Sequence, residues 1–305
     1  MEMEFDDLQL SIQESVRLLL ERRAGPERVR ELTESGAVDT YLLSGLHESG
    51  FLELFQDADA GPLCAALVCE WVSGAAGLVP IGWRALVAPS VLTGEIPLSV
   101  VVAEKGQTGP VRFAHDADLL IVLDGDDARA FDRDEFTTEP VRSIYGYPMA
   151  RVQVAGGRPL EPGSGSIARR WWKVALASEI AGTSEAVFNF MCKFLGEREQ
   201  FGRPLDSFQA LQHRLIEAYV HIEGTKWLSR EAAYLGAPAQ QAATAAITAV
   251  ETAKLMLHEA HQLAGAIGLT LEFDLHLWSL RLQTLRVEAG GAASHRTALA
   301  ESRWE

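Results

Sequence analysis

Apolar side chains recur every three or four residues near the start of the chain. Leu8, Ile12, Val16 and Leu19 follow this spacing, which predicts an amphipathic helix with one buried face. The Gly25-Pro26 pair is typical of a stop after such a helix, because glycine and proline both interrupt the helical period. Further glycine and proline breaks predict three or four more short helices before about residue 94.

The pattern changes to that of β-strands in the next part of the chain. Three short segments are rich in β-branched residues and are separated by glycine, aspartate and proline breaks, which predicts strands. These segments are Leu98–Val102, Leu119–Leu123 and Ala150–Val154. The sequence Asp124-Gly125-Asp126-Asp127 has the composition of a hairpin turn. We therefore expect a small antiparallel β domain here.

The helical period returns after a linker at Pro162–Ser166 and persists to the end of the chain. Five helices are predicted, over residues 167–196, 207–235, 238–264, 272–287 and 293–302. Ser207 is the expected N-cap of the second of them, because serine is a favoured capping residue. Long antiparallel helices of this kind form a bundle, and bundles bind cofactors between facing helices or at helix ends.

The patterns divide the chain into three regions. We expect an N-terminal helical domain over residues 1–95, a shortened antiparallel β domain over 96–163, and a C-terminal four-helix bundle over 164–305. The fold class is therefore mostly α with a small β domain. A chain of 305 residues is long enough to bury a sizeable core.

Charge and composition narrow the classes of partner. The chain carries 42 acidic against 27 basic residues, a formal net charge of -15, which argues against binding to nucleic acid or to an anionic membrane. The acidic residues near the N-terminus do not fit a signal peptide, and no uninterrupted apolar run approaches the length of a membrane span. A cytoplasmic protein is the expectation.

Neither the cysteines nor the histidines predict a metal site. Cys64 and Cys69 lie in an apolar run without a matching cluster of ligands, and three cysteines are too few for a disulfide framework. His258 and His261 are three residues apart on a predicted helix. They are interpreted as polar residues of the bundle, because no Glu-x-x-His pair accompanies them.

The most informative motif lies between the first two bundle helices. It runs Arg198-Glu199-Gln200-Phe201-Gly202 and is followed by Phe208-Gln209. An arginine fork makes bidentate contacts to phosphate oxygens, and an apolar ring beside a tight glycine turn suits a phosphate-bearing aromatic cofactor. The alternative interpretation is an arginine that only balances the dipole at a helix C-terminus.

The order of these elements resembles the acyl-CoA dehydrogenase family, most clearly over residues 167–300. In that family the matching arginine reaches the FAD pyrophosphate of a neighbouring protomer, and the resemblance places this role on Arg198. It implies that Gln200 and Phe201 seat the same nucleotide and that Gln209 lies near its adenine end. A second family motif, Gln-x-x-Gly-Gly-x-Gly, appears as Gln262 to Gly268 with Gly265 and Gly268 retained.

The chain departs from the family at the catalytic base. The resemblance implies a carboxylate that removes a proton from the α carbon of an acyl-CoA, and one family position for it falls on Ala289. Glu288 is adjacent, and a shift of one residue on a loop would present it, so it stays a weak candidate. The preferred interpretation of Glu288 is a solvated surface charge. The other family position falls on Trp172, which is not a carboxylate.

The expected β domain also departs from the family's pattern. The family's flavin-contacting segment corresponds to residues 101–110, which lack its order and length, and the β domain contains no tryptophan. In the α2β2 acyl-CoA dehydrogenases of actinobacterial steroid catabolism, a complete chain pairs with a degenerate one. This chain resembles the degenerate one. The resemblance therefore implies the short subunit of such a heterotetramer, with FAD as cofactor, a full-length homologue as partner and an acyl-CoA as substrate.

Two other hypotheses stay open. The first is a self-sufficient homodimeric flavin oxidoreductase with non-standard chemistry, in which Glu288 or no base is used. The second is a scaffold subunit that keeps the fold but does not bind flavin. The nature of the acyl group is not encoded in any motif.

Overall fold

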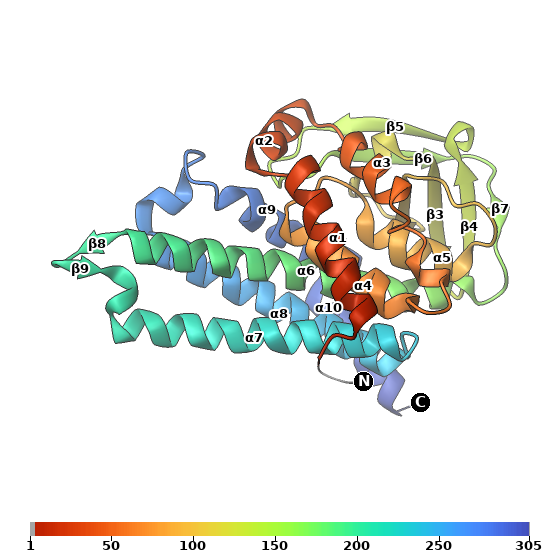
Figure 1. The fold of residues 1–305 in the computed structure, drawn as a ribbon. Helices are drawn as coiled ribbons and strands as arrows, with labels where there is room; N and C mark the ends of the chain where they lie inside the picture. Colours follow the sequence, from red (N-terminus) through yellow and green to blue (C-terminus); the bar gives the residue numbers. More distant parts are fainter. Residues whose placement is uncertain (1–3, 305) are drawn as a thin grey trace.

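The computed structural model describes residues 4–304 and contains an N-terminal group of helices, small β-sheets and a C-terminal helical bundle (Figure 1). The N-terminal helices are α1 (Asp7–Arg23), α2 (Pro26–Ser35), α3 (Thr40–Glu48), α4 (Gly61–Gly74) and α5 (Ala88–Val91). Asp6 and Gln9 form a capping box at the start of α1, and Ile12 and Val16 are its buried face. No helix within residues 4–304 is long and apolar enough to cross a membrane.

The β region contains two small sheets and is rich in antiparallel pairs. The first sheet has the order β1-β3-β4-β7, with β1 (Val100–Glu104), β3 (Leu119–Asp124), β4 (Asp127–Asp132) and β7 (Arg158–Pro159). The second has the order β2-β6-β5, with β2 (Val111–Arg112), β6 (Met149–Val154) and β5 (Phe136–Val141). Asp124 pairs with Asp127, so the predicted hairpin turn is confirmed. Strands β1 and β3, in contrast, pair in parallel.

The C-terminal bundle consists of long helices and confirms the predicted fold class. Its helices are α6 (Ser164–Glu197), α7 (Gln209–Tyr234), α8 (Ala239–Ala264), α9 (His276–Leu285) and α10 (Gly291–Trp304). The expected N-cap is wrong, because α7 begins at Gln209 after Phe208. Ser207 lies in a short 3-10 turn instead, and its hydroxyl donates to the carbonyl of Pro204.

Helix α6 is the central element of the molecule, because it packs against α4, α7 and α8. Glycine allows the closest of these approaches. A Cβ atom added at Gly182 would lie 1.8 Å from the carbonyl oxygen of Glu70 in α4. The two helix backbones therefore meet at a position where only glycine fits.

Replacing Gly182 with alanine is expected to lower the free energy of unfolding by about 1–3 kcal/mol, because α4 and α6 must separate to admit the methyl group. Gly224→Ala in α7 is the matched control, since no atom lies within 4 Å of its added Cβ. That control should instead raise stability by up to about 1 kcal/mol through helix propensity. Urea unfolding of both variants measures the two effects, and a Gly182→Ala protein as stable as the wild type would contradict this packing.

Candidate functional site

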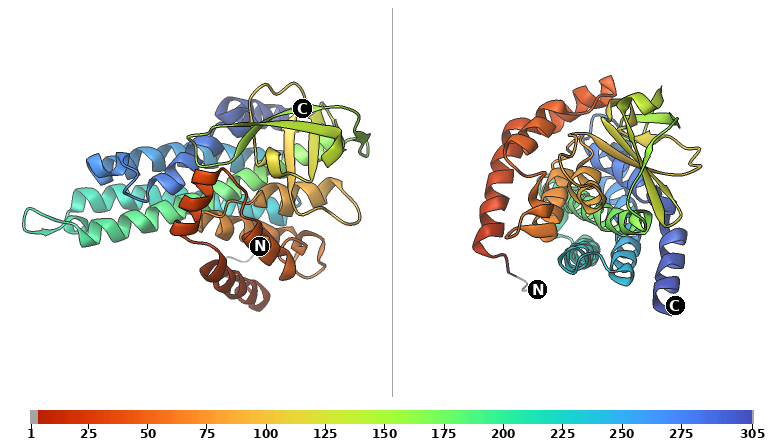
Figure 2. Two further views of the ribbon diagram at one scale, coloured as in Figure 1. Left: turned by 90° about the horizontal axis from the view of Figure 1, so that it is seen from above. Right: turned by 90° about the vertical axis from the view of Figure 1, so that its right-hand side faces the viewer.

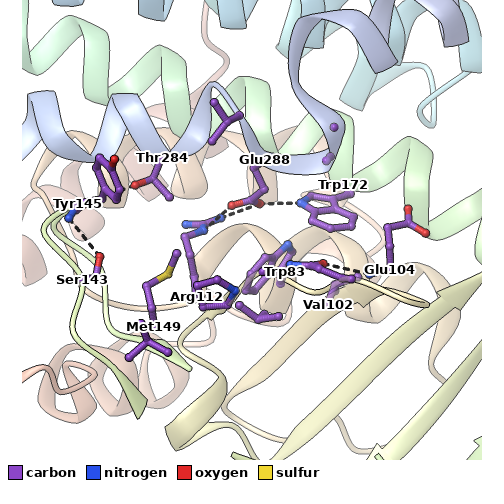
Figure 3. A pocket seen from close by; sticks show the side chains of 18 of the residues that line it. Trp83, Val102, Glu104, Arg112, Ser143, Tyr145, Met149, Trp172, Thr284 and Glu288 are labelled. Atoms are coloured by element: carbon purple, nitrogen blue, oxygen red, sulfur yellow. Dashed lines mark hydrogen bonds and ion pairs between the residues drawn. The ribbon is translucent and has the colours of Figure 1, made fainter. Parts of the chain in front are cut away.

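A cavity of about 990 Å³ opens between the β-sheets and the bundle (Figure 3). Much of its wall is apolar and aromatic, with Val102 and Met149 from the sheets and Trp83 and Trp172 from helical segments. The two indole rings meet edge to face with centroids 6.0 Å apart. A cavity of this size is large enough for a substantial organic ligand.

Arg112 is the charged centre of the cavity wall. It projects from β2, and its side chain is only 4% exposed. Its guanidinium lies 4.7 Å from the ring centroids of both Trp83 and Tyr147, which is a cation–π distance. Its Nη1 donates to Glu179 in α6 at 2.9 Å. The strand, the bundle and the aromatic wall are therefore joined at this one side chain.

Glu288 forms the second ion pair of Arg112. Nε of Arg112 donates to Oε2 at 2.6 Å, Nη2 donates to Oε1 at 3.0 Å, and Nε1 of Trp172 donates to Oε1 at 2.7 Å (Figure 3). The side chain of Glu288 is 11% exposed. The expectation that Glu288 is a solvated surface charge is therefore wrong, because these three donors hold it in the cavity.

The backbone explains why Glu288 faces inward. Glu288 begins a 3-10 turn, and Ala289 follows in the left-handed conformation with φ 50° and ψ 33°. Gly290 and Gly291 also have positive φ, which glycine adopts without steric cost. The chain thus turns sharply at Ala289, where the resemblance places the family's base and where the side chain offers no titratable group.

Arg112, Glu179 and Glu288 form a group of charges that we call the cavity floor, and their interactions shift the pKa values of Glu179 and Arg112. Burial raises the pKa of Glu179, Arg112 opposes the shift and Glu288 adds to it. Burial also acts to lower the pKa of Arg112, but Glu179 and Glu288 together raise it well above its ordinary value. Arg112 is therefore charged throughout the physiological range and binds both carboxylates.

The residues of the Arg198 motif lie at a different place, the far end of the bundle (Figures 1 and 2). They form a hairpin between α6 and α7 with strands β8 (Glu199–Gln200) and β9 (Arg203–Pro204). Phe201 lies at its turn with φ 57° and is 88% exposed. A left-handed conformation at an exposed aromatic residue is a strained feature typical of functional sites. Arg198, Gln200 and Gln209 are exposed as well.

The second motif lies toward the same end of the bundle, on the last turn of α8 and in the 3-10 turn that follows it. Gln262 and Gly265 are exposed, and a Cβ at Gly265 would meet no atom within 4 Å. Gly268 differs, because it is buried and a Cβ there would lie 2.7 Å from the Cβ of Ala264. In this chain Gly268 is therefore required for packing against α8, whereas Gly265 leaves open space beside the backbone.

The structure does not bring all predicted site residues together. Trp172 lies in the third turn of α6 and Arg198 caps its C-terminus, so at 1.5 Å per residue they are about 39 Å apart. No group of three or more metal-ligating side chains, His258 and His261 included, is arranged to hold a metal within residues 4–304. Sequence reasoning missed Arg112 and Trp83. A single charged residue between Val111 and Phe113 in an apolar strand was the available signal.

A family model described as the acyl-CoA dehydrogenase C-terminal domain matches residues 170–303. This part of the chain is similar to the C-terminal domain of acyl-CoA dehydrogenases. The match covers nearly all of α6 and continues into α10, so it includes both exposed motifs. The cavity, in contrast, is shared between the matched segment and the β-sheets that precede it.

Two curated relatives carry the same printed name. Acyl-CoA dehydrogenase IpdE2 of Mycobacterium tuberculosis is 32% identical over 168 residues, which cover 54% of this chain and 51% of that protein. Acyl-CoA dehydrogenase IpdE2 of Mycolicibacterium smegmatis is 28% identical over 286 residues, which cover 88% of this chain and 90% of the relative. The first match thus spans about half of the relative's length, and the second spans most of it.

Solved structures share the acyl-CoA dehydrogenase fold over nearly the whole chain. The ChsE4-ChsE5 complex from Mycobacterium tuberculosis gives a TM-score of 0.83 at 18% identity, covering 99% of this chain and 98% of the other. The Tcur3481-Tcur3483 steroid ACAD variant gives 0.81 at 21% identity, covering 97% of each chain. At these identities the likeness concerns the fold alone.

Proposed function

We propose that this chain is a subunit of a heteromeric FAD-dependent acyl-CoA dehydrogenase and contributes FAD contacts rather than the catalytic base. The supporting observation is the Arg198–Phe201 hairpin: its aromatic tip is 88% exposed, and Arg198 lies about 39 Å along α6 from Trp172 in the wall of the chain's own cavity. A single FAD does not extend over that distance. The hairpin is therefore available to a nucleotide held in a neighbouring subunit.

The exposed residues fit a dinucleotide. No ion pair to Arg198 forms within residues 4–304, so its guanidinium is free to bind pyrophosphate oxygens. Gln200, Phe201 and Gln209 would seat the nucleotide beside it, and Gln262 with the open backbone at Gly265 would approach the phosphates. When bound, FAD supplies the hydride acceptor for α,β-desaturation of an acyl-CoA thioester. Gly268 keeps its packing role.

The base is assigned to the partner in this proposal. Ala289 stands at the family's base position, and three donors already occupy the carboxylate of Glu288. The partner would be a full-length acyl-CoA dehydrogenase homologue in a cytoplasmic α2β2 heterotetramer. The printed names of the ChsE4-ChsE5 complex and the Tcur3481-Tcur3483 steroid ACAD support a two-chain assembly and a steroid-derived acyl-CoA.

One observation favours a second candidate function. Because Glu288 faces the cavity, a self-sufficient flavin oxidoreductase would have a carboxylate near a bound ligand. That candidate function requires that the isolated chain catalyses a flavin-dependent oxidation and that the Glu288→Gln variant loses this activity. A scaffold without flavin would instead form the complex with no flavin contact from this chain.

The proposal is tested by replacing Arg198 with alanine in a complex co-expressed with a full-length acyl-CoA dehydrogenase homologue as partner. Losing one charge-assisted phosphate contact should weaken FAD binding at least tenfold, at about 1.5–3 kcal/mol. FAD affinity is measured by reconstituting the apo-complex with FAD and following flavin fluorescence.

Lys193→Ala is the matched control, because Lys193 is an exposed basic residue on the last turns of the same helix. It should leave FAD affinity unchanged. Equal FAD affinity in the Arg198→Ala and wild-type complexes would refute the assignment and favour the flavin-free scaffold.

A further inference from the structure

Glu288 has hydrogen-bonding capacity that the protein does not use. A carboxylate offers about four acceptor positions on its two oxygens. Arg112 and Trp172 occupy both positions on Oε1, whereas Oε2 accepts only from Nε of Arg112. One position on Oε2 is therefore left, on a side chain that lines the cavity (Figure 3).

We propose that this cavity binds an apolar ligand bearing an uncharged hydroxyl group, and that Glu288 positions the ligand by accepting a hydrogen bond from that hydroxyl. Glu288 is a positioning residue in this assignment, and no proton leaves the ligand. The cavity would thus recognise a hydroxylated ring compound or acyl chain by one polar contact within mainly apolar walls.

The charge balance of the floor favours a neutral donor over a cation. Arg281 is fully buried close to Arg112, and both guanidinium groups lie within 5.3 Å of the Tyr147 ring centroid. The formal charges of these two buried arginines are balanced by those of two carboxylates, Glu179 and Glu288, both of which pair with Arg112. A ligand ammonium would add an uncompensated charge beside buried groups, whereas a hydroxyl adds none.

The side chains of the cavity wall indicate the chemical nature of the rest of the ligand. Trp83, Trp172, Val102 and Met149 line the cavity with large apolar surfaces, and the two indoles meet at 74°. Flat hydrocarbon rings pack well against such surfaces, whereas a charged or heavily hydrated group placed against these four side chains would lose its water without replacement. The hydroxyl would then be the one polar group that is paired at the floor.

Ligand binding in the cavity is independent of the proposed FAD contacts at the end of the bundle. The cavity and Arg198 are about 39 Å apart along α6, so their ligands do not meet. The Arg198→Ala variant is therefore expected to leave ligand binding in the cavity unchanged, and the cavity is tested by a separate experiment.

The test uses two probes of nearly equal shape, 2-naphthol and 2-methoxynaphthalene, of which only the first has an O–H donor. Calorimetry gives the dissociation constants of both for the full chain. The wild type is expected to bind 2-naphthol about tenfold more tightly, the effect of a hydrogen bond to a charged acceptor. In Glu288→Gln this preference should disappear, because the amide carbonyl turns to Arg112 and its N–H₂ meets the ligand.

A merely structural role of Glu288 predicts a different result. It would weaken both probes by the same factor and leave their ratio unchanged, which would overturn the proposal. Met149→Trp narrows the cavity at one wall and should weaken the binding of both probes; unchanged affinity for both would place them elsewhere and also refute the proposal. If Glu288→Gln does not fold, Glu288→Asp replaces it, because this change withdraws the carboxylate by one methylene. An unchanged ratio of the two dissociation constants in Glu288→Asp would also contradict the proposal.

Discussion

Replacing Arg112 by methionine is expected to lower the free energy of unfolding by about 3–5 kcal/mol, a decrease of about 10 °C in Tm. The variant would leave Glu179 and Glu288 buried without their cation, and it would also remove the guanidinium between Trp83 and Tyr147. Breaking a buried ion pair by removing one partner costs more than the pair contributes, because the remaining charge is uncompensated.

Two further variants isolate this effect. Arg142→Met changes an exposed arginine that also lines the cavity, and it should alter stability by no more than about 0.5 kcal/mol. Adding Glu179→Gln and Glu288→Gln to Arg112→Met removes the orphaned charges, so part of the lost stability should return. Urea unfolding distinguishes the cases. An Arg112→Met protein with wild-type stability would show that the buried pairs do not hold the β-sheets to the bundle.

The second large effect concerns pH and His295 in α10. This histidine is fully buried, and neither ring nitrogen has a hydrogen-bond partner within residues 4–304. Burial, and to a lesser extent the charge of Lys173, lowers the pKa of His295 to about 4. The folded protein thus resists protonation of a ring that the unfolded chain protonates near pH 6.5.

The sign of the pH effect follows from this difference. The stability associated with neutral His295 is fully present above pH 6.5 and is lost as the pH falls toward 4, by on the order of 3 kcal/mol. His295→Leu should lack this component, whereas the exposed His213→Leu control should retain it. Unfolding free energies between pH 7 and 4 provide the measurement. Identical pH profiles for the wild type and His295→Leu would contradict the assignment.

Local periodicity was sufficient to predict most helices and the fold class. The apolar faces of α1 and α6–α8 repeat at helical spacing, and their observed ends lie within a few residues of the expected ones. Strands β4 and β5 were missed, because each carries several exposed polar residues and lacks a β-branched apolar run. The parallel pairing of β1 with β3 was missed because it joins segments that no local turn connects.

The cavity floor could not be predicted in the same way. Arg112 contacts Glu179 and Glu288 at separations of 67 and 176 residues, which no local pattern encodes. The inward direction of Glu288 depends on the left-handed conformation of Ala289, a residue type that rarely adopts it. The Arg198 motif was readable because its residues are contiguous, although the sequence did not show how far Phe201 extends into solvent.

The central claim is that the FAD contacted by this chain is held in a neighbouring subunit. Its most direct test is the flavin content of the purified chain alone, compared with its complex with the full-length homologue and with the Arg198→Ala complex. We expect little flavin in the chain alone, flavin in the wild-type complex, and less in the Arg198→Ala complex. A chain that purifies alone with one FAD per molecule and oxidises an acyl-CoA would contradict the account.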